Sequence, residues 1–232
     1  MDGEDKKEPK PHYHGHRKRL RRRFLEGGSE ALPDYELLEL ILFASNTRGD
    51  VKPLAKTLIE RFGGFQRVLS APPRKLAEIK GLKETGIVAI KAAQAAALRL
   101  ARAEAMEQPV MSSWQKVLDY CRASMAYEEN EAFRLLFLDR RNQLIADEEQ
   151  QRGTIDHTPV YPREVVRRAL ELGAASIIMV HNHPSGDATP SSSDIDMTQA
   201  VKDAAEGLGI SLHDHIIICR GDHSSMKGLG LI

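Results

Sequence analysis

Two histidines that lie two residues apart are the first feature of this sequence that could do chemistry. His181 and His183 directly follow the apolar run 177–180, which is short, mostly β-branched and followed by a Pro/Ser/Gly loop, as expected for a buried strand. Alternate residues of a strand point to the same side, so both imidazoles can face one point. Asp194 lies three residues after Ser191, where a helix is predicted to begin. Two imidazoles and one carboxylate, with a fourth position left to water, form the ligand set of a catalytic zinc ion. The sequence therefore predicts one Zn²⁺ per chain, bound by His181, His183 and Asp194.

Each part of this pattern also has a purely structural explanation. A His-x-His pair at a strand end is often a pair of polar loop residues, and Ser191 and Asp194 have the spacing of a helix capping box. The acidic residue preferred in that box is Glu or Gln rather than Asp. The full order is His-x-His, seven residues, Ser, two residues and Asp, which is much more specific than either part.

The full pattern resembles the metal-binding signature of the JAMM (MPN+) metalloproteases. With the loop sequence Asn-His-Pro-Ser-Gly at 182–186, it is most similar to the bacterial RadC branch of that class. The resemblance extends over nearly the whole chain after residue 15, through the segments 15–17, 32–38, 153–155, 162–164, 181–194 and 214–215. It implies a zinc-dependent peptidase or isopeptidase, in which metal-activated water hydrolyses a peptide or isopeptide bond of a protein or peptide substrate.

The resemblance also implies roles for residues outside the ligand set. Ser191 matches the serine that donates a hydrogen bond to the oxyanion, and Glu131 matches the upstream glutamate that acts as the general base. Glu164 is the alternative base, because spacing does not decide between the two glutamates. His213 and His215 could form a second metal site, but we expect His215 to be structural or to hold the second nitrogen of a ligand histidine.

The elements that must position these residues predict an α/β (α+β) fold with two domains. In residues 108–232 strands and helices alternate, which predicts a mixed sheet flanked by helices. The resemblance implies a JAMM/MPN-like domain with the layer arrangement of cytidine deaminases. Residues 16–107 read as a small all-helical domain, and residues 1–15 as a disordered polar tail. The polar, proline-containing stretch 104–113 is the predicted boundary.

The helical domain contains two features that suggest DNA as a partner. Residues 79–83 followed by a long helix resemble a helix-hairpin-helix, in which backbone N–H groups bind a phosphate. Lys83 replaces the second glycine of that motif and Gly86 its small alanine. The segment 17–25 forms a basic helix, and residues 1–107 carry 21 Lys/Arg against 15 Asp/Glu. The alternative function is therefore a DNA-binding repair or recombination accessory protein of RadC type with a structural metal, although hairpins and charged helices also serve in plain packing or protein binding. A third hypothesis is an interaction scaffold without stoichiometric metal.

Composition excludes several other classes of protein. No apolar run approaches the roughly 20 residues that span a bilayer, and the polar N-terminus lacks the apolar core of a secretion signal, so we expect a cytoplasmic protein without membrane contact. The two cysteines, Cys121 and Cys219, form no Cys-x-x-Cys pair and are expected to be buried. The sequence predicts neither the oligomeric state nor the identity of the substrate.

Overall fold

The computed structural model describes residues 15–152 and 160–232 and divides the chain into two compact units, 1–96 and 97–232. The division falls inside one long helix, α6 (Glu84–Met106), whereas the sequence placed the boundary just after that helix. Except for Gly15, the predicted tail 1–15 lies outside the described residues, as does the segment 153–155 of the family resemblance.

The described part of the first unit is helical, as the sequence predicts. After α1 (His16–Gly27) and the short 3₁₀ turn η1 (Ser29–Ala31) come α2 (Asp34–Ser45), α3 (Lys52–Phe62), α4 (Phe65–Ser70), α5 (Pro73–Ala77) and the beginning of α6. Their apolar faces enclose one core, formed mainly by Leu38, Leu42, Leu58, Leu76 and Ile90. The chain is therefore organised by helix periodicity interrupted at glycines and prolines.

The predicted hairpin of the first unit depends on two glycines. Gly81 has a φ of 90°, a left-handed conformation that other residues rarely adopt, and it allows the turn between α5 and α6. At Gly86 an added Cβ would lie 2.7 Å from Cδ1 of Leu82. Gly86 thus fills the role that the sequence assigned to a small packing residue.

The second unit is an α+β domain built on a five-stranded mixed sheet. After the 3₁₀ turn η2 (Val110–Ser112), its elements are α7 (Trp114–Met125), β1 (Ala132–Leu138), β2 (Leu144–Arg152), α8 (Pro162–Leu172), β3 (Ser176–Asn182), α9 (Ser192–Glu206), β4 (Ser211–Ile218) and β5 (His223–Ser225). The strand order is β2-β1-β3-β4-β5, in which β3 and β4 are parallel and the other neighbours antiparallel. The predicted fold class is confirmed.

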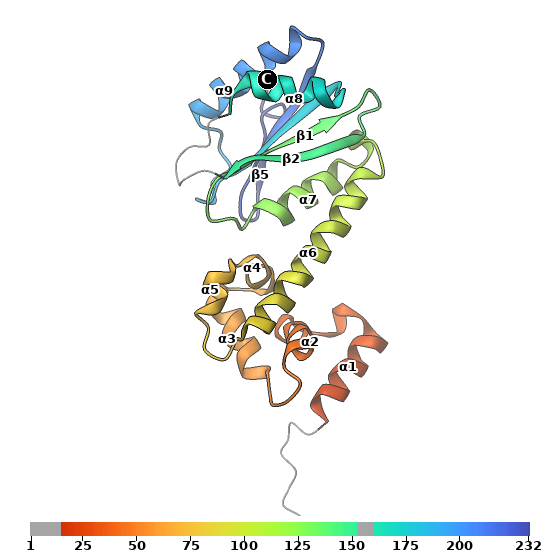
Figure 1. The fold of residues 1–232 in the computed structure, drawn as a ribbon, viewed down its shortest axis with the longest axis vertical. Helices are drawn as coiled ribbons and strands as arrows, with labels where there is room; N and C mark the ends of the chain where they lie inside the picture. The colour runs from red at the N-terminus through yellow and green to blue at the C-terminus, as the bar shows by residue number, and fades with distance from the viewer. Residues whose placement is uncertain (1–14, 153–159) are drawn as a thin grey trace, which may run out of the picture. The chain divides into compact units, whose positions relative to one another are not determined.

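Helices cover both faces of this sheet (Figure 1). On one face α8 and α9 pack on a core that includes Phe133, Leu135 and Met179. On the other face α7 packs on a core that includes Leu136 and Val180. Because side chains alternate between the faces, β1 and β3 are apolar on both sides, as is typical of central strands.

Strand direction brings the candidate residues to one end of the sheet. β1 and β3 are antiparallel, with Phe133 opposite His181, so the start of β1 lies beside the end of β3. β3 and β4 are parallel, with Asn182 opposite Ile218. The residues just before β1 and those just after β3 are consequently neighbours, although about fifty positions separate them in the sequence.

A buried ionic cluster joins α7 to the sheet. The Asp147 side chain on β2 is fully buried and accepts hydrogen bonds from Arg134 on β1, 2.9 Å from Nε and 2.8 Å from Nη2, and from the hydroxyl of Tyr120 on α7. Burial and this contact with Asp147 raise the pKa of Tyr120 above its ordinary value. The carboxylate thus links three elements on this face of the sheet.

None of the helices in the described ranges combines the length and the apolar character that a membrane-spanning segment requires. The cysteines Cys121 and Cys219 are both buried and free, as predicted.

Candidate metal centre

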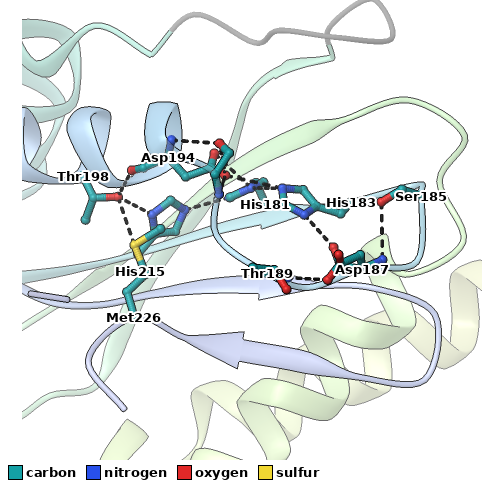
Figure 2. A network of polar contacts seen from close by, with 10 residues as sticks. His181, His183, Ser185, Asp187, Thr189, Asp194, Thr198, His215 and Met226 are labelled. Carbon is teal, nitrogen blue, oxygen red and sulfur yellow. Dashed lines mark hydrogen bonds and ion pairs between the residues drawn. The ribbon is translucent and has the colours of Figure 1, made fainter. Parts of the chain in front are cut away.

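The predicted ligands meet at the end of β3. His181 and His183 approach Asp194, which reaches them from the first turn of α9 (Figure 2). Nε2 of His181 lies 2.9 Å from Nε2 of His183 and 3.3 Å from Oδ1 of Asp194, and Nε2 of His183 lies 3.5 Å from Oδ2 of Asp194. Within residues 15–152 and 160–232, this is the one group of three or more His, Cys, Asp or Glu residues whose possible ligand atoms all lie within 4.8 Å of one another.

Hydrogen bonds behind His181 determine which of its nitrogens carries a hydrogen. Oγ1 of Thr198 lies 2.5 Å from the backbone carbonyl oxygen of Asp194 and 2.6 Å from Nδ1 of His215. A carbonyl oxygen can only accept, so the Thr198 hydroxyl donates to it and in turn accepts from Nδ1–H of His215. Nε2 of the neutral His215 then accepts from Nδ1–H of His181, 2.8 Å away. Nε2 of His181 is left with a lone pair that faces the centre.

A backbone carbonyl determines the same arrangement for His183. Its Nδ1 lies 2.7 Å from the carbonyl oxygen of Asp187, in the loop that connects β3 to α9 (Figure 2). Since that oxygen can only accept, Nδ1 carries the hydrogen and Nε2 carries the lone pair. Gly186, with a φ of 93°, provides the left-handed turn that brings this part of the loop back towards His183.

The donor set fits a metal cation. Two ring nitrogens lie 2.9 Å apart beside a carboxylate, and their lone pairs repel one another unless a proton on His183 or a metal ion lies between them. Zinc bonds to nitrogen and oxygen of about 2.0 to 2.2 Å at tetrahedral angles place the ligand atoms roughly 3.3 Å apart. The 3.3 Å between Nε2 of His181 and Oδ1 of Asp194 meets this requirement, and the two histidine nitrogens, 2.9 Å apart, need an outward shift of only a few tenths of an ångström.

The titration properties of the three side chains suit ligands at neutral pH. Burial lowers the pKa of His181 to about 4, so its imidazole is neutral. Its contact with Asp194 raises the pKa of His183. Burial raises the pKa of Asp194, but contacts with His183, His181 and Ser191 outweigh this effect and hold it below the usual range. Asp194 is therefore a carboxylate, and a proton on His183 is the one that a metal would displace.

Comparisons with known proteins show the family of this chain. A model of the RadC-like JAB domain matches residues 111–231, and a model of the UPF0758 N-terminal domain matches residues 14–88. A UPF0758 protein of Ruegeria pomeroyi is 58% identical over 217 residues, which cover 94% of this chain and 97% of that protein. A UPF0758 protein of Rhodobacter capsulatus is 59% identical over 213 residues, which cover 92% of this chain and 100% of that protein. The chain belongs to the UPF0758 family, with a RadC-like JAB domain.

In this UPF0758 chain, Ser191 and Asp194 form the capping box that the sequence left as an alternative. Oγ of Ser191 accepts from the backbone N–H of Asp194 at 3.1 Å and donates to Oδ2 of Asp194 at 2.6 Å, while the backbone N–H of Ser191 also donates to Oδ2 at 2.8 Å. The box holds Oδ2 and leaves Oδ1 for a metal. Capping and metal binding are therefore compatible, and the oxyanion role of Ser191 stays a prediction.

The structure places the two candidate bases of the JAB domain in different surroundings. Glu131 directly precedes β1, at the end of the sheet where the ligands lie, and its charge contributes to the raised pKa of His183. Glu164 lies in the first turn of α8, and its carboxylate accepts from Arg167 at 2.9 and 3.0 Å. Glu164 also lines a separate cavity of about 270 Å³ between β2 and α8. Of the two glutamates, Glu131 lies at the end of the sheet where the ligands meet, and its role as the base stays a prediction.

Sequence reasoning found one supporting residue of this JAB centre and missed others. His215 contacts the second nitrogen of His181, as predicted, whereas His213 packs against Trp114, about 6.2 Å between ring centroids. Thr198 was missed, although its place one helical turn after Asp194 is a usable signal. Met226, whose sulfur lies 3.4 Å from Oγ1 of Thr198, gave no signal because its contact depends on the turn after β5 (Figure 2).

Proposed function

We propose that this chain is a zinc-dependent peptidase or isopeptidase. One observation carries the proposal. Two histidine lone pairs and a carboxylate converge on one point, and Glu131, which is not one of these ligands, lies at the same end of the sheet. Zinc bound by His181, His183 and Asp194 would lower the pKa of a bound water to about 7 and so supply hydroxide at neutral pH. Membership in a JAB family is compatible with a hydrolase.

Glu131 and Ser191 would handle the proton of the attacking water and the negative charge of the oxyanion. As oxygen of water bonds to the carbonyl carbon, Glu131 accepts the proton that the water loses. When the carbon–nitrogen bond breaks, Glu131 passes this proton to the leaving amine, so its carboxylate is restored. Ser191 is exposed at the start of α9, and its hydroxyl can turn from Asp194 to donate to the oxyanion of the tetrahedral intermediate.

Metal content and cleavage test this proposal together. The purified protein should contain about one zinc ion per chain, and His183→Ala should lose it because two ligands do not hold zinc tightly. The zinc-loaded protein is then incubated with a quenched-fluorescent peptide library and with peptides joined through a lysine isopeptide bond. Glu131→Gln should retain zinc and lose about 10²-fold or more in rate. Glu164→Gln is the matched control and should retain the rate.

Two outcomes would contradict the proposal. Full activity of Glu131→Gln would show that another group is the base. Stoichiometric zinc without cleavage of any probe peptide would favour a metal that only stabilises the fold, which is the alternative of a DNA-associated accessory protein.

A specific observation supports that alternative as a second candidate function. On α1, Arg17 and Arg23 are engaged within the unit, with the carbonyl oxygen of Gly49 and with Glu36. Lys18 and Arg21 are exposed on the same helix. Two outward cations on a helix of a unit rich in Lys and Arg could contact the phosphates of DNA.

Salt dependence of DNA binding tests this second candidate. Replacing Lys18 and Arg21 together by Glu should weaken binding to a duplex of arbitrary sequence and reduce the slope of log K against log salt by about two. Lys202→Glu in the second unit is the control. An unchanged slope in the α1 variant would exclude this surface.

A further inference from the structure

The side chain of Asn182 makes hydrogen bonds to the backbone at the point where the pairing of β1 with β3 stops. Regular pairing ends with Phe133 opposite His181. One residue further, the backbone N–H of Ala132 donates to Oδ1 of Asn182 at 2.7 Å, and Nδ2 of Asn182 donates to the carbonyl oxygen of Asn130 at 3.2 Å. Asn182 is only 1% exposed, so neither bond is shared freely with water.

These two backbone groups belong to the peptide units on either side of Glu131. The carbonyl of Asn130 belongs to the peptide that precedes Glu131, and the N–H of Ala132 belongs to the peptide that follows it. Each peptide unit is planar, so fixing both units fixes the direction in which the Glu131 side chain leaves the backbone. One buried amide therefore orients a glutamate that no regular strand pairing holds.

We infer that Asn182 is the positioning residue for Glu131, which it holds beside the ligand pair His181 and His183. The inference rests on the proposed function, because Glu131 is the base of the proposed reaction and Asn182 is the residue that positions it. Asn182 lies between the two ligand histidines in sequence, on a strand end fixed by the bond from the His183 N–H to the carbonyl oxygen of Ile218, 2.8 Å long. The same strand end thus places both ligands and, through Asn182, the base.

The chemistry of the contact selects asparagine. The site needs an acceptor for one N–H and a donor for one carbonyl on a short side chain, which is what a primary amide provides. Aspartate cannot donate to the carbonyl of Asn130 when ionised, and leucine leaves the buried N–H of Ala132 without an acceptor. Glutamine is longer by one methylene.

A measurement on the Co²⁺-loaded protein tests the inference without requiring a substrate. The visible spectrum of bound Co²⁺ is titrated with pH in the wild type, Glu131→Gln, Asn182→Leu and the double variant. We expect Glu131→Gln to move the midpoint, Asn182→Leu to move it in the same direction by most of that amount, and the double variant to move it no further. Asn182→Ser, which is smaller and can reach only one of the two backbone groups, replaces Asn182→Leu if the latter does not fold.

Val180→Ala is the matched control, because it removes buried volume from the same strand face without touching the backbone around Glu131. It should bind Co²⁺ with the wild-type midpoint. A wild-type midpoint in the Asn182 variant that is measured, alongside a moved midpoint in Glu131→Gln, would overturn the inference. No movement in Glu131→Gln would also overturn it, because Glu131 would then lie away from the metal.

Kinetics separate this inference from the proposed function. With any probe peptide that the zinc-loaded protein cleaves, Asn182→Leu should lower kcat by about 10²-fold and leave KM unchanged, since a misplaced base slows the reaction without weakening binding. A rise in KM with kcat unchanged would contradict a positioning role. If the wild type cleaves nothing while the Co²⁺ midpoints still move together, the proposed hydrolysis fails but the positioning of Glu131 by Asn182 stands.

Discussion

Thr198, which contacts none of the three ligand side chains, determines which nitrogen of His181 faces the metal centre. Thr198 has one hydroxyl hydrogen, and giving it to the Asp194 carbonyl obliges His215 to donate and His181 to present its lone pair. The backbone carbonyl of Asp194 can only accept, and this one restriction determines every later donor in the series. The tautomers of both histidines are thus set by a threonine and a backbone carbonyl.

Replacing Thr198 by valine tests this chain of hydrogen bonds. The shape is nearly retained, but Nδ1–H of His215 loses its acceptor, so the preference for the required tautomer weakens. We expect zinc affinity to fall by about 10- to 100-fold, as for other residues that orient metal ligands. Competition with a chromophoric chelator measures the affinity. Thr198→Ser keeps the hydroxyl and should bind zinc almost as the wild type does; equal losses in both variants would indicate a packing defect instead.

The pH dependence of metal binding follows from the two histidines. Contact with Asp194 raises the pKa of His183 above its ordinary 6.5, while burial lowers that of His181 to about 4. Below the raised pKa, His183 carries a proton that the metal must displace, so affinity should fall as pH falls through this range. Calorimetry in buffers of different ionisation enthalpy should detect release of about one proton per zinc near pH 6.5. Asp194→Asn should bind too weakly to serve as a control, so Asp203→Asn, an exposed change later on α9, is the reference.

The ligand residues could be predicted from the sequence because a metal site needs particular residue types at a fixed spacing. His181, His183 and Asp194 are brought together by the alternation of a strand and the first turn of a helix, which are local. Thr198 and Asn182 could not be predicted with equal ease. The contact of Thr198 with the Asp194 carbonyl is local to α9, but its contact with His215 and the contacts of Asn182 with the backbone around Glu131 reach other elements, and sequence spacing does not reveal those.

At the scale of elements, α7 is held to the sheet by the buried carboxylate of Asp147. Asp147→Ala should lower the free energy of unfolding by about 3 kcal/mol or more, because the guanidinium of Arg134 loses its buried partner. Urea denaturation measures the difference. Glu149 is exposed and 3.7 Å from Arg134, so Glu149→Ala should cost less than about 1 kcal/mol. Similar costs for both variants would show that the buried cluster contributes no more than a surface pair.

The sequence predicted element boundaries well where glycine or proline ends a segment. α8 begins at Pro162 and ends before Gly173, which has a φ of 65°, so a proline and a glycine mark the two limits of this helix. β5 was not predicted, because three residues between turns are too short to show alternation. The order of strands also followed only from the structure, since β1 enters between β2 and β3 through long-range pairing.

At the scale of the whole molecule, the three candidate ligands all belong to the second unit. A ligand stabilises the part of a protein that binds it, by about 2.7 kcal/mol when its concentration is a hundred times Kd. Zinc should therefore slow amide exchange in β1, β3 and α9 and leave α2 to α5 unchanged, as measured by hydrogen–deuterium exchange with mass spectrometry. Uniform slowing in both units would show that they unfold as one body. His183→Ala should abolish the effect of zinc.

The contact between His181 and His215 also has a consequence for the order of events during synthesis. β3 precedes β4 in the chain, so both ligand histidines are synthesised before His215, which fixes the tautomer of His181. Until β4 joins β3, either nitrogen of His181 can carry the hydrogen, and Thr198 lacks the imidazole it will support. We expect a cation that binds before β4 docks to be held less tightly than one that binds afterwards, because the tautomer that presents Nε2 of His181 is not yet fixed. Formation of the high-affinity centre therefore requires the docking of β4.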